Sequence, residues 1–292
     1  MELKYYVDKN NKYKNINEIL SLEFNLSSKL QSKLIRNEKI YKNNNVVDTR
    51  NDISIGDTIL VDLNMEEDNS NIVPTKMQLN IIYEDDWFLV LDKPSGIAVH
   101  PSYLHYDTSL SNGVKYYFDL IGLKKKIRPV NRLDFNTSGV VIFAKCEYIQ
   151  EELSKQMKKG VFEKYYLALV EGILPNKKGT INLPIARKKG SIIERCIDKN
   201  GQDAITKYTV IKEFQDYSLI KLKLETGRTH QIRIHMKAID HPILGDTLYN
   251  NPSSKINRQA LHSYQIKCIH PITNGSLIFT SKLAKDMESL IK

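Results

Sequence analysis

The sequence contains little cysteine and no long apolar run. Its three cysteines, Cys146, Cys196 and Cys268, lie far apart and form no Cys-X-X-Cys pair, which argues against a structural zinc site and a disulfide framework. No run approaches the roughly 20 apolar residues of a membrane span. The N-terminus also lacks the apolar core of a signal peptide. We therefore expect a reduced, soluble cytoplasmic protein with no membrane contact.

Basic residues, by contrast, are in excess. The 292 residues include 43 lysines and arginines against 34 acidic residues, a formal charge of +9. This excess fits a polyanionic partner such as RNA, DNA or an acidic membrane, although many soluble proteins carry as much charge without one. A polar, acidic stretch with one proline, residues 64–77, is typical of a linker. It predicts a small domain over residues 1–63 and a large one over residues 78–292.

In the small domain, apolar residues at helical spacing predict a first helix around residues 16–24. Ser27 or Ser28 can cap a second helix, and Asn37 can take the left-handed conformation that ends it. The residues expected on its apolar face are Leu30, Leu34 and Ile35, and those on its basic face are Lys29, Lys33 and Arg36. Short strands are expected around residues 39–42, 46–47 and 58–62.

The order of these parts resembles the alpha-L RNA-binding domain over residues 12–63. LSSKLQSKLIRNEKI and ISIGDTILVDL match its two helices and its closing strand. The resemblance implies that Lys29, Lys33 and Arg36 contact RNA. One departure is Glu38, which stands where that domain usually has glycine. The alternative is a small α/β unit whose lysines are only solvated.

The large domain mixes strands and helices with few βαβ repeats. Strands are expected at residues 81–83, 88–91, 140–144, 165–170, 206–211 and 219–224, a Lys/Gly-rich hairpin region at 177–202, and helices near 109–120 and 149–158. This mixture predicts an α+β fold with a mostly antiparallel sheet.

Asp134 lies in NRLDFNTSGVVIFAK, just ahead of an apolar run that predicts a strand buried on both faces. A charge so close to a buried strand is costly unless it is paired or used. Asp134 is a candidate catalytic carboxylate fixed by the Asn-Thr-Ser-Gly turn. The commoner alternatives are a turn-capping aspartate and a salt bridge to Arg132.

A second segment, LETGRTHQIRIHMKAIDHPILGD, predicts a helix capped by Thr229 and ended by His241-Pro242. Arg228 or Arg233, near the helix start, could hold the Asp134 carboxylate in a bidentate pair. The alternative is that both arginines are solvated or bind only phosphate. The two histidines of this helix are five residues apart and do not share one face, so we expect no metal site.

A third segment, EKYYLALVEG, places Tyr165 and Tyr166 at the start of a strand. Strand alternation turns Tyr166 to the opposite face from Leu167. Paired tyrosines more often pack in a core, but a base-stacking platform is the alternative.

These segments, with EDDWFLVLDKPSGIAVHPS before and RQALHSYQIKCIHPITN after them, resemble the RluA-type family of RNA pseudouridine synthases over residues 78–292. The resemblance implies a mixed, mostly antiparallel curved sheet with flanking helices and a central cleft. It also implies isomerisation of uridine to pseudouridine in RNA, without cofactor or metal. By position, Asp134 matches the catalytic aspartate, Tyr166 the tyrosine that packs on the uracil, and Arg233 the basic partner of the aspartate. Arg132 matches the residue that holds the RNA strand, and Ile232 joins the substrate-binding set. Asn131 departs from a common histidine.

The chemistry agrees with this set. Uracil leaves as a delocalised anion, so one carboxylate suffices where glycoside hydrolases typically need two. Asp134 would attack the anomeric carbon or remove a ribose proton, and the target uridine must leave its stack to reach it. We expect ribosomal RNA of the large subunit as substrate and a monomeric enzyme. Alternatives are a transfer RNA substrate, a non-catalytic RNA-binding or chaperone protein, and a nucleoside hydrolase.

Overall fold

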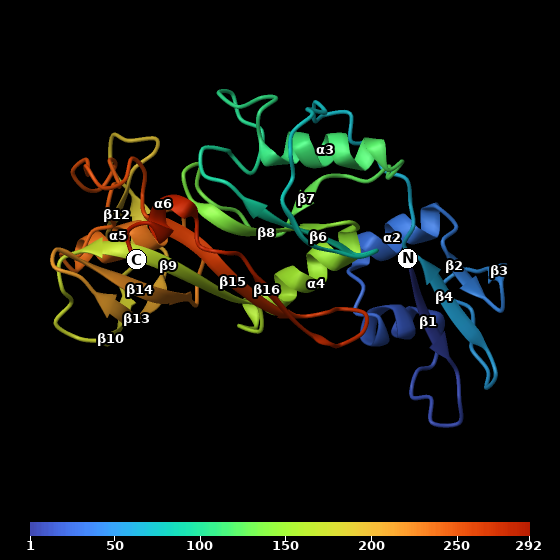
Figure 1. Ribbon diagram of the computed structural model, residues 1–292. Helices are drawn as coiled ribbons and strands as arrows, with labels where there is room; N and C mark the ends of the chain where they lie inside the picture. The colour runs from blue at the N-terminus through green and yellow to red at the C-terminus, as the bar shows by residue number, and fades with distance from the viewer.

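The computed structural model describes all 292 residues. The chain forms two separate larger sheets, a short hairpin and a few helices (Figure 1). The helices are α1 (Ile16–Glu18, continued by a π-helical turn over Ile19–Glu23), α2 (Ser28–Arg36), α3 (Leu110–Leu120), α4 (Glu147–Lys158), α5 (Gln231–Ala238) and α6 (Lys285–Glu288). The strands of the first 63 residues are β1 (Glu2–Tyr6), β2 (Ile40–Lys42), β3 (Asn45–Val46) and β4 (Thr58–Asp62).

The large sheet contains ten strands. They are β5 (Ile81–Glu84), β6 (Phe88–Lys93), β7 (Arg128–Pro129), β8 (Ser138–Ala144), β9 (Glu163–Glu171), β10 (Lys178–Asn182), β13 (Ile205–Glu213), β14 (Tyr217–Leu224), β15 (Leu261–Ile269) and β16 (Ser276–Thr280). Its order is β10-β13-β14-β9-β15-β8-β6-β5, with β16 beside β15 and β7 beside β8. The separate hairpin consists of β11 (Ile185–Arg187) and β12 (Arg195–Ile197).

Only the pair of β15 and β8 is parallel in this sheet, and every other pair is antiparallel. The α+β prediction with a mixed, mostly antiparallel sheet is therefore confirmed. The parallel pair joins two antiparallel halves, and its register is short, His262 opposite Ser138 and Ser263 opposite Gly139. At this seam Gly139 has φ +113°, and a Cβ there would lie 2.2 Å from the Ser263 carbonyl oxygen. Only glycine allows so close an approach.

The position of β8 between two cores explains why its run of apolar residues is unbroken. Val140 and Ile142 pack into one core with α4, whereas Val141 and Phe143 pack into a second core with α3. All seven residues of β8 are buried, so the predicted burial on both faces is confirmed. Figure 1 shows α3 above this part of the sheet and α4 below it. The loop that precedes β8 is thus attached to a strand that is buried on both faces.

The first 63 residues form a sheet of their own, in the order β1-β4-β2-β3, with α1 and α2 packed on it. We call this part the N-terminal module. Strand β1 has no counterpart in the sequence predictions. Ile35, expected on the apolar face of α2, is instead exposed. Asn37 was also predicted wrongly: its φ is −99°, and Glu38, at φ 53°, holds the left-handed position that usually takes glycine.

The N-terminal module packs on α4 through polar and apolar contacts. Its buried apolar residues belong to the same core cluster as Ile149 and Leu153 of α4. The Asn25 amide donates to the Glu152 carboxylate at 3.0 Å, and the Ser27 hydroxyl donates to Glu151 at 2.9 Å. In Figure 1 the module, in blue, lies beside α4 at the opposite end of the molecule from α5.

Residues 64–77 contain no helix or strand, as expected of a linker, but they are bound to the body of the protein. The Glu67 carboxylate accepts two hydrogen bonds of 2.6 Å from Arg128 and one of 2.8 Å from Lys33. Further along, the Thr75 amide donates to the Asn112 carbonyl on α3. The segment is therefore held to the rest of the protein by hydrogen bonds and is not a free linker, and we call residues 64–77 the strap.

Candidate active site

Asp134 lies in the turn between β7 and β8, beside the seam of the large sheet. The Thr137 amide closes the turn on the Asp134 carbonyl at 3.1 Å. The buried Lys93 ammonium donates to the Phe135 carbonyl at 3.0 Å, and Arg258 donates to the Asn136 carbonyl at 3.0 Å. Burial lowers the pKa of Lys93 to about 7, since only carbonyl oxygens contact its ammonium. The turn that carries Asp134 is thus held through its backbone from both sides.

The Asp134 carboxylate faces the guanidinium of Arg233 on α5. Arg233 Nη1 donates to Asp134 Oδ2 at 3.1 Å, and the Asp134 side chain remains 26% exposed. The expected bidentate pair is wrong: Arg233 uses Nε and Nη2 to grip Asp246, both at 2.7 Å. Asp246 is buried, so it fixes the guanidinium, and Nη1 is the nitrogen that contacts Asp134.

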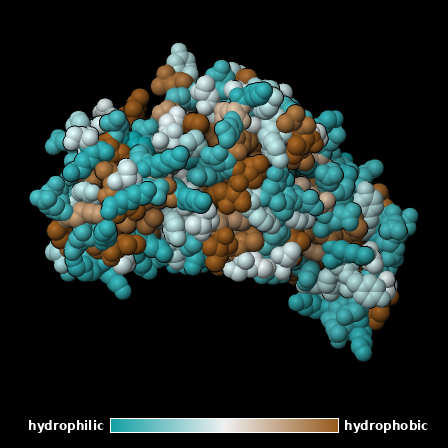
Figure 2. Space-filling model, viewed as in Figure 1, coloured by the Kyte–Doolittle hydropathy of each residue, from teal (hydrophilic) through white to brown (hydrophobic).

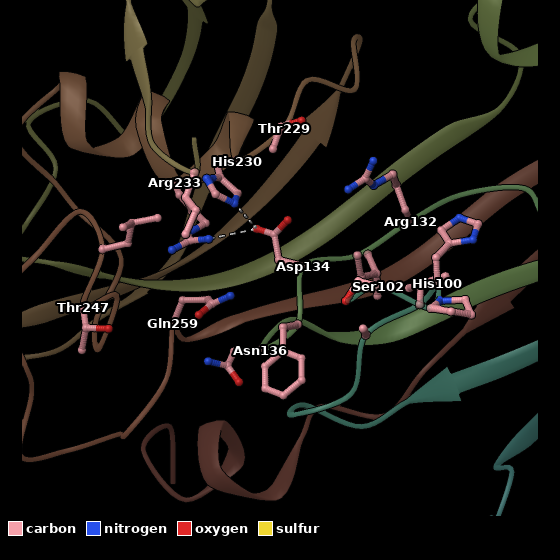
Figure 3. A pocket seen from close by; sticks show the side chains of 17 residues that line it. His100, Ser102, Arg132, Asp134, Asn136, Thr229, His230, Arg233, Thr247 and Gln259 are labelled. Atoms are coloured by element: carbon pink, nitrogen blue, oxygen red, sulfur yellow. Dashed lines mark hydrogen bonds and ion pairs between the residues drawn. The ribbon is translucent and has the colours of Figure 1, made fainter. Parts of the chain in front are cut away.

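His230 completes this side of the site (Figure 3). Its Nε2 lies 3.9 Å from Asp134 Oδ2, and its Nδ1 lies 2.8 Å from the Tyr249 hydroxyl. Burial lowers the pKa of His230, which keeps the ring neutral near pH 7. His230 also stands at the start of α5 in the left-handed conformation, φ 57°, so the predicted cap at Thr229 is wrong.

A cavity of about 450 Å³ opens beside the carboxylate, a size typical of small-molecule sites. Figure 3 shows Asp134 between His230 and Arg233 on one side and Arg132, Ser102 and His100 on the other. A smaller adjoining pocket is lined by Asp134 together with Tyr166 and Ile232. Both of these side chains are buried, and burial raises the pKa of the Tyr166 phenol. The carboxylate therefore meets water on one side and an apolar, aromatic wall on the other.

Arg132 is exposed and makes no ion pair with Asp134, so the alternative of a salt bridge between them is wrong. It lines the cavity mouth from the side opposite Arg233. Asn131, in place of the common histidine, is structural: its amide donates to the Val140 carbonyl at 3.0 Å and accepts from the Ile142 amide at 2.9 Å. It thereby ties the start of the loop to β8.

The three basic residues predicted on α2 lie far from this cavity, in the N-terminal module. Lys33 is committed to Glu67 and to Glu147, at 2.8 and 3.1 Å. Lys29 also approaches Glu147 but remains exposed, and Arg36 is exposed without an ion pair.

Three participants were not foreseen from the sequence: Asp246, His230 and Arg258. The motif that contains Asp246 was recognised, yet nothing in its spacing identified which carboxylate grips Arg233. A signal did exist, because an aspartate after Ile-Leu-Gly in an apolar stretch needs a buried partner. Arg258 is bidentate to Asp286 of α6, at 2.6 and 2.8 Å, so the C-terminal helix also supports the Asp134 turn.

Comparison with known proteins agrees with this geometry. Residues 87–238, which include Asp134, Tyr166 and Arg233, match the family model described as RNA pseudouridylate synthase. The chain belongs to this family. It is 38% identical over 239 residues to the RNA pseudouridine synthase YhcT of Bacillus subtilis, covering 81% of this chain and 79% of that protein. It is 34% identical to ribosomal large subunit pseudouridine synthase D of Blochmanniella floridana, covering 88% and 87%.

Among solved structures, human RNA pseudouridylate synthase domain containing 1 is similar, with a TM-score of 0.59 and 24% identity over 78% of this chain and 96% of that one. That similarity supports the fold. The resemblance to RluA-type enzymes is confirmed, and the protein is an RNA pseudouridine synthase. No helix of this synthase is long and apolar enough to cross a membrane.

Proposed function

We propose that Asp134 is the catalytic group of this pseudouridine synthase and that it acts on a uridine turned out of its RNA. The observation that carries the proposal is a single carboxylate, held by one N–H of a fixed guanidinium, that opens on a cavity at the seam of the sheet. Arg233 stabilises the charge of the carboxylate and orients it. Since Arg233 binds only Oδ2 of Asp134, the other oxygen of the carboxylate stays available to substrate.

Two routes use these groups. In the first, an Asp134 oxygen bonds the ribose C1′ while the bond from C1′ to uracil N1 breaks, and uracil leaves as an anion. In the second, Asp134 takes the C2′ proton as that bond breaks, leaving a glycal, and later returns the proton. In both, uracil turns over and its C5 bonds C1′, and in the first route the bond from Asp134 to C1′ breaks at this step. C5 then loses its proton to solvent, and N1 takes up a proton. Deuterium at C2′ separates the routes, because only the second predicts a primary isotope effect.

Tyr166 and Ile232 form the wall on which the uracil ring would lie. Their burial keeps the wall rigid and dry, which suits an intermediate that water would otherwise hydrolyse. Arg132, at the mouth, is placed to contact the phosphate backbone on either side of the target. Tyr166→Leu is expected to slow conversion while leaving RNA affinity near that of wild type.

The proposed substrate is large-subunit ribosomal RNA. The support is the similarity to several enzymes named ribosomal large subunit pseudouridine synthase D, at 33–36% identity. The test uses unmodified transcripts of large-subunit ribosomal RNA and of transfer RNA, labelled with tritium at uracil C5. Tritium release from the ribosomal transcript alone supports the proposal, and release from transfer RNA alone overturns it. Binding without release from either would favour a non-catalytic RNA-binding role.

We also propose that residues 1–63 form an RNA-binding module of the alpha-L type, contacting RNA through Lys29 and Arg36. Both side chains are exposed, whereas Lys33 is taken up by carboxylates. Deleting the module would strip the apolar cover from α4, so paired Lys29→Ala and Arg36→Ala substitutions are the cleaner test. They should weaken RNA binding and lower its salt dependence. An unchanged salt dependence would contradict this role.

A further inference from the structure

The segment between β6 and α3 projects from the body of the protein as a short turn. We call residues 102–106 the lip. The Ser102 amide donates to the His105 carbonyl at 3.3 Å, and the His105 amide donates back to Ser102 at 3.0 Å. Behind the lip, the Asn112 amide donates to the Tyr106 carbonyl at 3.1 Å. The lip is therefore a hydrogen-bonded turn with a defined shape rather than a loose connection.

The lip exposes large side chains that the fold does not use. Tyr103 is 99% exposed, Leu104 81% and Tyr106 64%. Figure 2 shows apolar surface at the upper edge of the molecule, where Figure 1 shows this segment looping out beside α3. Grouped exposed apolar residues of this kind usually mark a binding surface. Truncating them removes no contact on which the fold depends.

The lip adjoins the catalytic cavity. His100, Pro101 and Ser102, at its base, line the same cavity as Asp134. Its one inward ring, His105, stacks on Phe135 with ring centres 4.6 Å apart and planes at 18°. Phe135 directly follows Asp134 in the chain, so the lip and the catalytic turn share one contact.

We propose that the lip is a second RNA contact, in which Tyr103 and Leu104 stack against the bases next to the target uridine. The inference rests on the proposed function of the cavity. A uridine in the cavity leaves a gap in its own stack, and the neighbouring bases must pass the cavity rim, where an exposed ring can cover them. A protein bound on the lip would instead obstruct the entrance to the cavity. The basic Arg132 at the same mouth also favours a polyanionic occupant over an apolar protein surface.

The test measures binding of an unmodified large-subunit ribosomal RNA transcript by Tyr103→Ala and by the double variant Tyr103→Ala/Leu104→Ala. Loss of one stacked ring should weaken binding about tenfold. The salt dependence of the affinity should stay that of wild type, because no phosphate contact is lost. Tyr103→Phe keeps the ring and should bind within about twofold of wild type. Leu120→Ala, at a leucine 71% exposed on the far end of α3, is the matched control and should change nothing.

The outcomes separate the lip from the proposed function. Unchanged affinity in the double variant overturns the lip proposal even where wild type releases tritium from the transcript. Absence of tritium release by wild type overturns the function, while the affinities still decide the lip. A wild-type dimer that becomes monomeric in the double variant would assign the lip to self-association and overturn the proposal. Equal melting temperatures of all variants verify that folding is intact.

Discussion

Two buried arginines of the large domain hold carboxylates in different ways. Beside the N-terminal module, Arg128 grips Glu67 with two hydrogen bonds of 2.6 Å, and Lys33 adds a third at 2.8 Å. In the cleft, Arg233 grips Asp246 with two hydrogen bonds of 2.7 Å and binds Asp134 through Nη1. The side chain of Glu67 is 6% exposed, but that of Asp134 is 26% exposed.

The difference lies in how completely the charges are enclosed. At Glu67, burial opposes ionisation, but the hydrogen bonds from Arg128 and Lys33 outweigh it and lower the pKa of Glu67 to about 2. We call an arginine together with its carboxylates a junction, and a closed junction is one whose carboxylates are buried. The Arg128 junction is closed, and it joins the N-terminal module, the strap and the large domain. In the Arg233 junction Asp246 is buried, whereas Asp134 is partly exposed. An arginine and a carboxylate therefore join parts of the fold where they are enclosed, and we propose that they serve chemistry where one carboxylate faces a cavity.

The largest expected effect comes from substituting Asp134, the partly exposed carboxylate beside Arg233. Asp134→Asn and Asp134→Ala should lower tritium release to below about one thousandth of wild type, because no other carboxylate lines the cavity. Melting temperature and RNA affinity should stay close to wild type, since the turn is held by backbone contacts. Substantial release by Asp134→Ala would end the assignment of this residue.

Asp246→Asn tests the buried carboxylate that holds Arg233. The guanidinium loses its anchoring charge and its fixed orientation, so Asp134 is held less well. A displacement of this kind costs about a hundredfold in rate. A single-turnover assay at saturating RNA should show the loss in the rate of conversion rather than in affinity. A rate equal to wild type would show that Arg233 needs no second carboxylate.

Glu67→Gln tests the structural junction. Removing one partner of a buried ion pair costs about 3 kcal/mol of unfolding free energy, because Arg128 remains buried without a counter-charge. The adjacent Glu66→Gln is the matched control: Glu66 is 77% exposed and pairs with an exposed Lys124, so its loss should cost less than about 1 kcal/mol. Denaturant unfolding measures both, and equal losses would contradict the distinction.

Lowering the pH should reduce stability through His230, beside Asp134, and through Glu67 in different pH ranges. The pKa of His230 is lowered in the fold by burial, so the unfolded chain binds its proton first and stability falls as pH falls below about 6.5. Relative to His230→Asn, wild type should lose up to about 1.4 kcal/mol per pH unit there.

The stabilisation by Glu67 follows the same linkage at lower pH, because the pKa of this carboxyl is lowered from 4.5 to about 2. The stability difference between wild type and Glu67→Gln should stay constant from about pH 7 to 5 and shrink only below about pH 4.5. Unfolding curves at a series of pH values check both statements. A difference that shrinks already above pH 5 would contradict the closed junction.

Many strands and helices could be predicted from the sequence, because they depend on the local pattern of apolar residues. Periodicity located β5, β6, β8, β9, β13 and β14 as well as helices α3 and α4, to within a few residues. Errors occurred at helix ends, where the non-glycine residues Glu38 and His230 take left-handed conformations. Strand β1 was missed because its pairing with β4 joins distant parts of the chain.

For the site, the resemblance of the ordered motifs to RluA-type enzymes identified the family and the reaction, and it implied the choice of Asp134, Tyr166 and Arg233, because such a resemblance depends on residue identity and order. Only the tertiary structure decided that Asp246 rather than Asp134 receives the bidentate grip, that Lys33 belongs to an internal ion pair, and that the lip flanks the cavity. These facts depend on which side chains meet across the sheet. No local pattern encodes such distances, since they arise from packing between segments up to 114 residues apart.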